Sequence, residues 1–333
     1  MRILEAERRR EILWTVTGGG GSRPSQTEGI STGSYGFDKA LGVGGLPRGR
    51  LVEVFGPSGS GKTTLALHAV ANTQKAGGAA AFIDAEHALN LNYASGLDVR
   101  VGDLIVGKPD SGEKALELAL SLIDTGLVEL VVIDSVAALA PEKELAEPMG
   151  TDHFDEIEQM MGRGLRKLER SALRTGACVL FLNQVRRKSY EGSGDPETTA
   201  GGRPLRFHAA VRAELNEVEP LMESGAVVGS RVMMRVIKNR LSGGFRSSVA
   251  PMLQGEGFSK ELELLEIAAA HRVVETSGEE YAYRGQAVSR LELKERPSLV
   301  AVMMDEVRAS ARSLRMKAVG RATEPAIRKV QSA

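Results

Sequence analysis

The sequence predicts an α/β fold built on a mostly parallel sheet that helices cover on both faces. From Ile30 onward, short apolar segments of strand length alternate with amphipathic segments of helix length. Strands that are apolar on both faces and separated by helices are typical of a buried parallel sheet. After Val211 the pattern changes to paired strands, which we expect to extend one edge of this sheet. Beyond about Phe258 the chain becomes helical and charged, which indicates a small additional α+β domain.

The expected elements follow one another through short connections. The expected strands are segments 51–55, 80–84, 130–134 and 179–183, and the expected helices are segments 63–75, 111–125 and 155–175. Glycines at 77, 78 and 126 follow the first two helices, where a left-handed residue commonly ends a helix. The residues "SGG" at 242–244 are typical of a turn between two of the added strands.

Composition divides the chain into three regions. The N-terminal segment ends in "TGGGGSRPSQ", which has the glycine, serine and proline content of a linker. We therefore expect an N-terminal arm and linker over residues 1–29, a core over residues 30–258, and a C-terminal domain with a basic tail over residues 259–333.

Charge and cysteine content limit the class of protein. The 333 residues include 43 Lys or Arg and 43 Asp or Glu, so nucleic-acid binding would have to come from local patches. The one cysteine, Cys178, lies in an apolar run and is interpreted as a small core residue, and a single cysteine favours a reducing compartment. No segment has the pattern of a signal peptide or a membrane helix. We therefore expect a cytoplasmic protein without a membrane partner.

A phosphate-binding motif joins the strand 51–55 to the helix 63–75. The residues "GPSGSGKT" follow the pattern glycine, four residues, glycine, lysine, threonine. Glycines let backbone N–H groups converge on an anion, and the helix that follows directs its positive end at the same point. Lys62 would reach the β- and γ-phosphates and the hydroxyl of Thr63 would bind magnesium. The expected nucleotide contacts are Gly56, Pro57, Ser58, Gly59, Ser60, Gly61, Lys62, Thr63 and Thr64.

Acidic residues end two of the expected strands. Asp134 follows the apolar strand "LVVI", and a carboxylate there faces the ligand crevice of an open α/β sheet, so we expect it at the metal together with Thr63. A simple capping role for Asp134 is the alternative. Asp84 and Glu86 follow another strand, and Glu86 is a candidate to position the attacking water.

With these residues in place, the chain resembles the bacterial RecA recombinase family, as a divergent member. The similarity covers roughly residues 30–275, where five further motifs follow the phosphate loop in the family's order and spacing. They are "FIDAEHALNLNYA", "VVIDSVAAL", "FLNQVRRK", "GDPETTAGGRPLRFHAAVR" and "RVIKNR". The resemblance implies a RecA-type P-loop ATPase core that uses ATP and Mg²⁺.

The resemblance also implies roles for single residues. Glu86 matches the catalytic glutamate and Tyr93 the aromatic residue that stacks on adenine. Gln184 matches the glutamine that senses the γ-phosphate, and Lys238 and Arg240 match basic residues that reach the neighbouring subunit's ATP. A cation supplied in trans stabilises transition-state charge only when subunits are assembled. Without the resemblance, the two basic residues would be interpreted as solvated charges at a strand end.

Two loops are expected to contact DNA. The first, at 147–154, precedes the helix that carries Arg163, Arg166, Arg170 and Arg174. Arg166 matches a family residue that contacts DNA phosphate, whereas a solvated helix face is the favoured interpretation of the other three. The second, at 185–202, is long and rich in glycine. Its candidate contacts are Arg186, Arg187, Lys188, Gly201 and Gly202.

Several residues depart from the family pattern. The second loop has the polar centre "KSYEGSGD", Asn90 replaces the usual adenine-contacting aspartate, and Gln159 replaces an arginine. These changes concern DNA binding and strand exchange more than ATP hydrolysis. Only residues 11–17, which include Trp14, match the N-terminal strand that packs on a neighbouring subunit, and Trp14 suits its own domain equally well. The basic tail suits duplex DNA and a solvated helix equally.

Two functions from different classes follow. The first is a DNA-dependent ATPase that forms helical filaments on single-stranded DNA and promotes homologous pairing and strand exchange with double-stranded DNA in recombinational repair. The alternative is a DNA-binding filament scaffold that uses ATP as an assembly switch without efficient strand exchange. A ring-shaped motor with the same core is a third possibility, against which "PETTAGG" and "IKNR" argue.

Overall fold

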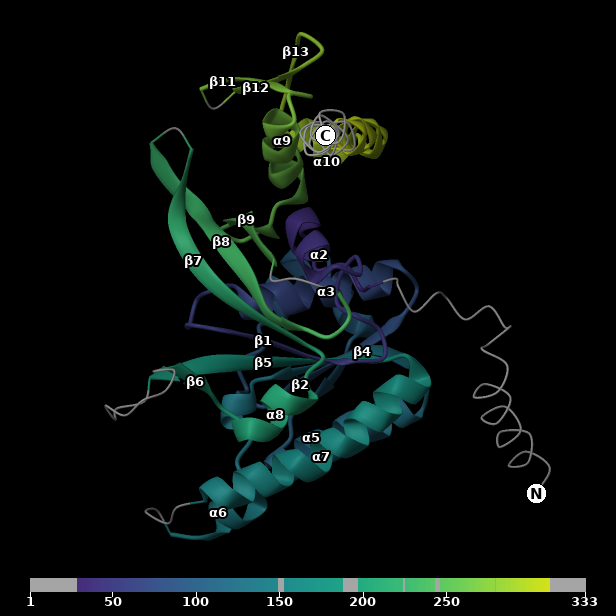
Figure 1. The fold of residues 1–333 in the computed structure, drawn as a ribbon, viewed down its shortest axis with the longest axis vertical. Helices are drawn as coiled ribbons and strands as arrows, with labels where there is room; N and C mark the ends of the chain where they lie inside the picture. The colour runs from purple at the N-terminus through teal and green to yellow at the C-terminus, as the bar shows by residue number, and fades with distance from the viewer. Residues whose placement is uncertain are drawn as a thin grey trace, which may run out of the picture.

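One large sheet forms the centre of the computed structural model (Figure 1). The structure describes residues 29–148, 153–187, 197–223, 225–242, 246–278 and 280–311. Neighbouring strands follow the order β10-β9-β8-β7-β1-β5-β4-β2-β3, and β6 pairs with β5 outside this path. The predicted arm at 1–29 lies outside the described residues except for its last position.

The parallel half of the sheet carries the predicted strands. Its members are β1 (Leu51–Gly56), β5 (Cys178–Arg187), β4 (Val128–Asp134), β2 (Ala79–Asp84) and β3 (Ile105–Gly107). Gly56 pairs with Gln184 and Asp84 pairs with Asp134, so the carboxyl ends of these strands lie level with one another. This half confirms the predicted fold class, and only the short edge strand β3 was not expected from the sequence.

An antiparallel half extends the sheet on the other side of β1. The strand β7 (Val211–Glu223) runs parallel to β1 and pairs antiparallel with β8 (Ala226–Asn239), which is followed by β9 (Arg246–Leu253) and β10 (Gly257–Phe258). The strand β6 (Glu197–Thr199) folds back on the end of β5. The β7–β8 ribbon projects from the core at the upper left of Figure 1. The predicted added strands are therefore confirmed, and they bring a second wall close to the phosphate loop.

Helices cover both faces of the sheet. One face carries α2 (Tyr35–Leu41), α3 (Lys62–Lys75) and α4 (Leu91–Gly96), and the other carries α5 (Gly112–Asp124), α7 (Phe154–Thr175) and α8 (Gly202–His208), with the short α6 (Glu142–Ala146) before α7. Successive residues of a strand point to opposite faces. Accordingly, Val132 belongs to the apolar cluster under α3, whereas its neighbour Ile133 belongs to the cluster under α5 and α7. Cys178 is buried in the first cluster, as expected for a core residue.

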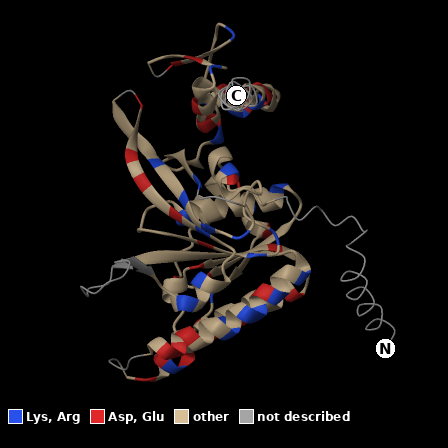
Figure 2. Cartoon of the chain, in the orientation of Figure 1, with Lys and Arg blue, Asp and Glu red and all other residues tan. Residues whose placement is uncertain are grey.

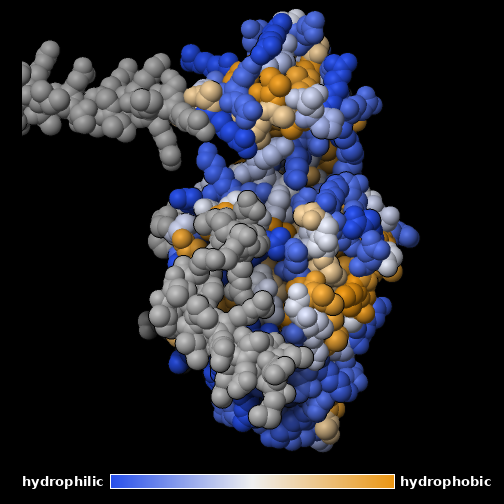
Figure 3. All heavy atoms as spheres, turned by 90° about the vertical axis from the view of Figure 1, so that its right-hand side faces the viewer, coloured by the Kyte–Doolittle hydropathy of each residue, from blue (hydrophilic) through white to orange (hydrophobic). Residues whose placement is uncertain are grey.

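The C-terminal part has its own apolar cluster and lies at the top of Figure 1. It contains α9 (Lys260–Ala270), the three-stranded sheet of β11 (Glu275–Ser277), β12 (Glu280–Tyr283) and β13 (Gln286–Val288), α10 (Arg290–Glu295), and helical residues 297–311. In Figure 3, hydrophobic side chains gather in one area of this part and in another on the core, between mostly hydrophilic surfaces.

A buried carboxylate joins the C-terminal part to the core. Glu263 of α9 accepts hydrogen bonds of 2.8 Å from Ser34 Oγ and from the backbone N–H groups of Tyr35 and Gly36, at the N-terminus of α2. Burial raises the pKa of this carboxyl to about 6, against the effect of the three donors. The predicted boundary between residues 258 and 259 falls between β10 and α9 and stays a prediction.

Candidate nucleotide site

The phosphate loop joins the central strand β1 to α3, and two of its glycines have a left-handed conformation. Gly59 and Gly61 have φ angles of 79° and 86°, which residues with a β-carbon rarely adopt. Lys62 donates hydrogen bonds to the carbonyl oxygens of Gly56 (3.1 Å) and Pro57 (2.6 Å) and so lies folded over the loop. Ser60 Oγ is buried and has no partner within the described residues. Such a loop at a helix N-terminus provides a cradle for a polyphosphate.

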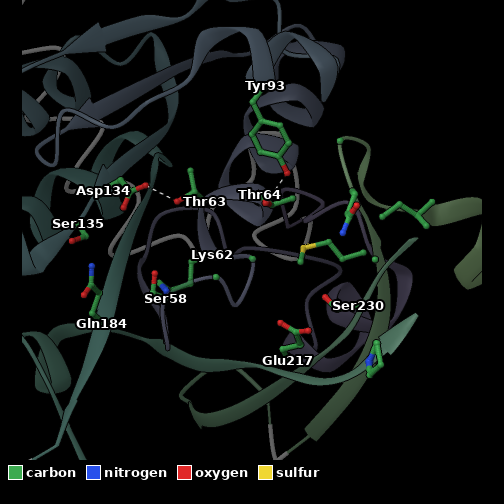
Figure 4. A pocket seen from close by; sticks show the side chains of 18 of the residues that line it. Ser58, Lys62, Thr63, Thr64, Tyr93, Asp134, Ser135, Gln184, Glu217 and Ser230 are labelled. Atoms are coloured by element: carbon green, nitrogen blue, oxygen red, sulfur yellow. Dashed lines mark hydrogen bonds between the residues drawn. The ribbon is translucent and has the colours of Figure 1, made fainter. Parts of the chain in front are cut away.

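A hydroxyl and a carboxylate meet beside the loop. Thr63 Oγ1 donates to Asp134 Oδ2 over 2.8 Å (Figure 4). Burial raises the pKa of Asp134 to about 6, and the nearby charge of Glu86 acts in the same direction. Burial likewise lowers the pKa of Lys62. No cluster of three metal-ligating side chains occurs in the part of the chain that the structure describes. One hydroxyl and one carboxylate fit Mg²⁺, which is usually held by few protein groups together with phosphate oxygens and water.

A second carboxylate, that of Glu86, lies close enough to Asp134 to act on its pKa. Glu86 Oε1 accepts one hydrogen bond from Gln184 Nε2 (3.0 Å) and a short one from Ser135 Oγ. Glu86 follows β2, Ser135 follows β4 and Gln184 lies in β5, so three neighbouring strands of the sheet bring these groups together. This carboxylate is fixed by two donors and can orient a water molecule near the loop.

Tyr93 forms one side of the space beyond the loop. Its hydroxyl lies 2.9 Å from Thr64 Oγ1 on α3, and Figure 4 shows the ring directed toward Thr64. Asn90 caps α4, since its Oδ1 accepts from the N–H of Tyr93 (3.0 Å). Asn90 does not line the cavity, whereas Tyr93 and Thr64 do.

A cavity of about 470 Å³ lies between these groups and a second wall. The antiparallel strands supply that wall, with Glu217 and Ser230 facing the loop in Figure 4. The complete second wall is Glu217, Pro220, Val227, Gly229, Ser230, Met252, Leu253, Gln254 and Gly255. None of these residues was predicted, and neither was Ser135. The available signal was topological, because strands added beside β1 must flank the loop that follows β1.

Lys238 and Arg240 do not line this cavity. Lys238 Nζ donates to the carbonyl oxygens of Arg206 (2.5 Å) and Phe207 (2.9 Å) at the end of α8, and burial lowers its pKa to about 8. The guanidinium of Arg240 lies 5.3 Å from the ring centroid of Phe207. Both cations therefore lie outside the nucleotide cavity of their own protomer.

The residues expected to contact DNA lie on α7 and around the second loop. Arg166 is on α7, where Figure 2 shows Lys and Arg along the helix among acidic residues. Arg186 and Arg187 end β5, in register with 198 and 197 of β6, and Lys188 lies outside the described residues. Gly201 and Gly202, both with positive φ, begin α8. The first loop lies outside the described residues at 149–152.

A buried polar network connects the second loop to the central strand. The side chain of Glu53 in β1 is fully buried, and it accepts hydrogen bonds from Asn183 Nδ2 (2.9 Å) and from Arg212 Nε. Asn183 Nδ2 also donates to the carbonyl oxygen of Ala200 (2.9 Å), and its Oδ1 accepts from the N–H of Gln184 (2.8 Å). The residues that flank the loop are thus held to the phosphate-loop strand by hydrogen bonds. Sequence reasoning missed this network because a single glutamate within an apolar strand has no motif.

Within the described residues, no helix is both long and apolar enough to cross a bilayer. A loop suited to a polyphosphate, next to a carboxylate that two donors hold in place, defines the class of P-loop nucleoside triphosphatases.

Comparison with known proteins identifies the family within this class. Residues 15–259 match the model of the RecA N-terminal domain. The chain is 46% identical to Protein RecA of Geobacter sulfurreducens over 277 residues, and this match covers 81% of the chain and 82% of the relative. It is 44% identical over 284 residues to Protein RecA of Citrifermentans bemidjiense (84% of each chain), and 43% identical over 298 residues to Protein RecA 1 of Myxococcus xanthus (88% and 87%). The chain belongs to the RecA family. It is an ATP hydrolase and a recombinase of DNA repair.

Proposed function

We propose that each protomer binds ATP with Mg²⁺ in the cavity beside α3 and couples hydrolysis to single-stranded DNA held by the loop at 185–202. The observation that carries this proposal is the hydrogen bond from Gln184 to Glu86. Glu86 is the carboxylate placed to orient water, and Gln184 lies in the strand that leads into the loop. A change at the terminal phosphate would therefore reach the loop through one side chain.

The chemistry assigns a role to each group around the cavity. The loop N–H groups and Lys62 bind the phosphates, while Glu86 orients the attacking water and draws its proton. Thr63 and Asp134 would hold Mg²⁺, which supplies charge neutralisation when it is bound. Tyr93 offers a ring face to the base.

Assembly would complete the site. Lys238 and Arg240 lie outside their own protomer's cavity, which suits groups that act on a neighbour's triphosphate. A contact between two different faces of identical subunits is heterologous, and repetition of such a contact generates a helical filament when it does not close. The proposed partners are further copies of the chain, single-stranded DNA and double-stranded DNA. The proposed location is the cytoplasm, on the basis of the single cysteine.

Turnover of ATP with and without single-stranded DNA tests the coupling. We expect turnover to rise on addition of DNA, because DNA bound at the loop would stabilise the end of β5 and with it the hydrogen bond from Gln184 to Glu86. Equal rates in both conditions would reject the coupling while leaving the ATPase site intact.

A filament scaffold without efficient strand exchange is the second candidate. The feature that favours this candidate is the polar centre of the second loop, "KSYEGSGD". A joint-molecule assay separates the two candidates, because the scaffold would bind DNA and form filaments without yielding joint molecules.

A further inference from the structure

His68 ties the phosphate-loop helix to the second wall of the cavity. Its Nε2 accepts a hydrogen bond from the backbone N–H of Phe258 (2.9 Å), and the two rings lie 6.0 Å apart between centroids. Phe258 pairs with Met252 across β10 and β9. The end of β9 and the turn that follows it contribute Leu253, Gln254 and Gly255 to the cavity lining. The hydrogen bond therefore fixes the distance between α3 and this turn.

The approach of His68 to β10 requires a glycine at residue 257. Gly257 has a φ of 72°, and a β-carbon at this position would lie 2.4 Å from His68 Nε2 and 3.0 Å from Thr64 Cγ2. A side chain at residue 257 would push the turn away from the helix. The glycine therefore lets the imidazole reach the backbone of the turn directly.

The imidazole is held in its neutral form. Burial lowers the pKa of His68 to about 4, and the charges of Lys260 and Lys75 act in the same direction, against the smaller opposite effect of Asp98. A neutral ring that accepts at Nε2 carries its proton on Nδ1. The ring thus presents Nε2 as an acceptor at neutral pH.

A second residue of α3 holds the opposite wall. Thr64 lies four residues before His68, so both side chains project from the same face of the helix. Thr64 Oγ1 contacts the hydroxyl of Tyr93 (2.9 Å), whereas His68 contacts the backbone before α9. These two contacts are made from positions of α3 that lie one helical turn apart. Between them they bound the space from Tyr93 to residues 252–255.

We propose that His68 is a positioning residue for the nucleobase of ATP. Together with Thr64, it sets the width of the slot between Tyr93 and the turn, and it acts on the base without contacting the phosphates. This inference rests on the proposed ATP site and adds to it the residue that shapes the base end.

Binding of two ligands of different composition tests the proposal. The ligands are MgATP and magnesium tripolyphosphate, which has the phosphates without a base. We expect His68→Ala to weaken MgATP binding about tenfold, as for loss of one hydrogen bond with local loosening, and to leave tripolyphosphate binding unchanged. The turnover rate at saturating ATP should change less than about twofold, so the loss would appear in KM.

Two further variants serve as controls. His68→Gln supplies an amide oxygen that can accept from the same N–H and should restore most of the MgATP affinity. Lys75 lies on the same helix as His68, and Lys75→Ala removes its exposed ion pair with Asp98, so both affinities should stay unchanged. Circular dichroism of each variant checks that it is folded, and His68→Gln keeps the test valid where His68→Ala is unstable.

Three outcomes would overturn the proposal. A parallel loss of both affinities in His68→Ala would show that the histidine supports the phosphate loop. An unchanged MgATP affinity would show that the wall does not depend on this contact. If the wild-type protein bound tripolyphosphate as tightly as MgATP, the base slot would be rejected and the phosphate site would stand. Failure to bind either ligand would instead overturn the proposed ATP site itself.

Discussion

Gln184 Nε2 lies 3.0 Å from Glu86 Oε1, so the carboxylate beside the phosphate loop is bonded directly to the strand that enters the second loop. Ser135 Oγ is the second donor to the same oxygen. Ser135 follows β4, whereas Gln184 lies in β5, which continues into a loop with a proposed DNA contact. This asymmetry allows the two hydrogen bonds to be separated by mutation.

Glu86→Gln should abolish turnover and retain ATP binding. The amide keeps the size of the side chain but cannot draw a proton from water, so we expect a loss of at least about 10²-fold in kcat. Ser135→Ala is the matched control, because it removes one donor and leaves the carboxylate, and it should cost less than about tenfold. Steady-state turnover and equilibrium ATP binding are the measurements. Near-normal turnover in Glu86→Gln would remove Glu86 from the mechanism.

Gln184→Ala should uncouple ATP turnover from DNA. The Glu86 carboxylate remains, bonded to Ser135, so we expect the DNA-independent rate to stay within about threefold of wild type. The stimulation by single-stranded DNA should be lost. Full stimulation in the variant would show that the signal takes another route, for which the network around Glu53 is the alternative.

Mixing two inactive variants tests the trans role of the basic pair. Lys62→Ala lacks a phosphate ligand, and the double variant Lys238→Ala with Arg240→Ala lacks the cations for a neighbour. In an equimolar mixture, about a quarter of random head-to-tail contacts join an intact loop to an intact cation pair. We expect ATP turnover to reappear at about that fraction of the wild-type rate. No recovery, in filaments shown by microscopy to be mixed, would contradict the trans role.

Removal of the buried Glu53 carboxylate should destabilise the protein strongly. Glu53→Ala creates a cavity at a fully buried position and leaves the guanidinium of Arg212 without its carboxylate partner. Loss of one partner of a buried ion pair lowers the free energy of unfolding by about 3–5 kcal/mol. Glu53→Gln retains an acceptor and should cost less. Urea denaturation gives the free energies of unfolding. Equal effects of the two substitutions would show that the charge, and not the cavity, dominates.

The pH dependence of stability should carry the signature of His68. Its pKa is about 4 in the folded protein and 6.5 as the ordinary value, so the unfolded chain takes up the proton first as pH falls. The contribution of His68 to the free energy of unfolding is fully present above about pH 6.5. It decreases toward pH 4, and about 2 kcal/mol of it is lost at pH 5. His68→Gln should lack this component, so the wild-type advantage should shrink between pH 6.5 and 5. A constant difference across that range would contradict the neutral, buried imidazole.

The parallel core could be predicted from the sequence because its signals are local. The apolar strands, the helix that follows Lys62 and the glycines of the loop each follow from residues close together in the chain. Asp134 and Glu86 could be placed near the loop because parallel strands end at one edge of a sheet. The expected strand and helix bounds agree with the structure to within a few residues, apart from β5, which continues to Arg187.

The second wall and the buried network could not be predicted, since they depend on pairing between distant segments. Gly229 and Met252 reach the cavity only because β8 and β9 pair beyond β7, which itself pairs with β1. Glu53 has the sequence context of an ordinary sheet residue, and its partners come from β5 and β7. His68 likewise has the pattern of a helix residue on a packed face. Its hydrogen-bond partner, the N–H of Phe258, lies 190 residues away in the chain.

Lys238 already has two carbonyl partners at the end of α8, so a solitary subunit satisfies its ammonium group without help. Two carbonyl dipoles attract a cation less strongly than a fully charged triphosphate does, and the terminal phosphate carries much of that difference. Under the proposed arrangement, once a neighbour's nucleotide loses this phosphate, the lysine can return to its own helix. Depolymerisation would then follow from the chemical state of the nucleotide, without a dedicated release domain.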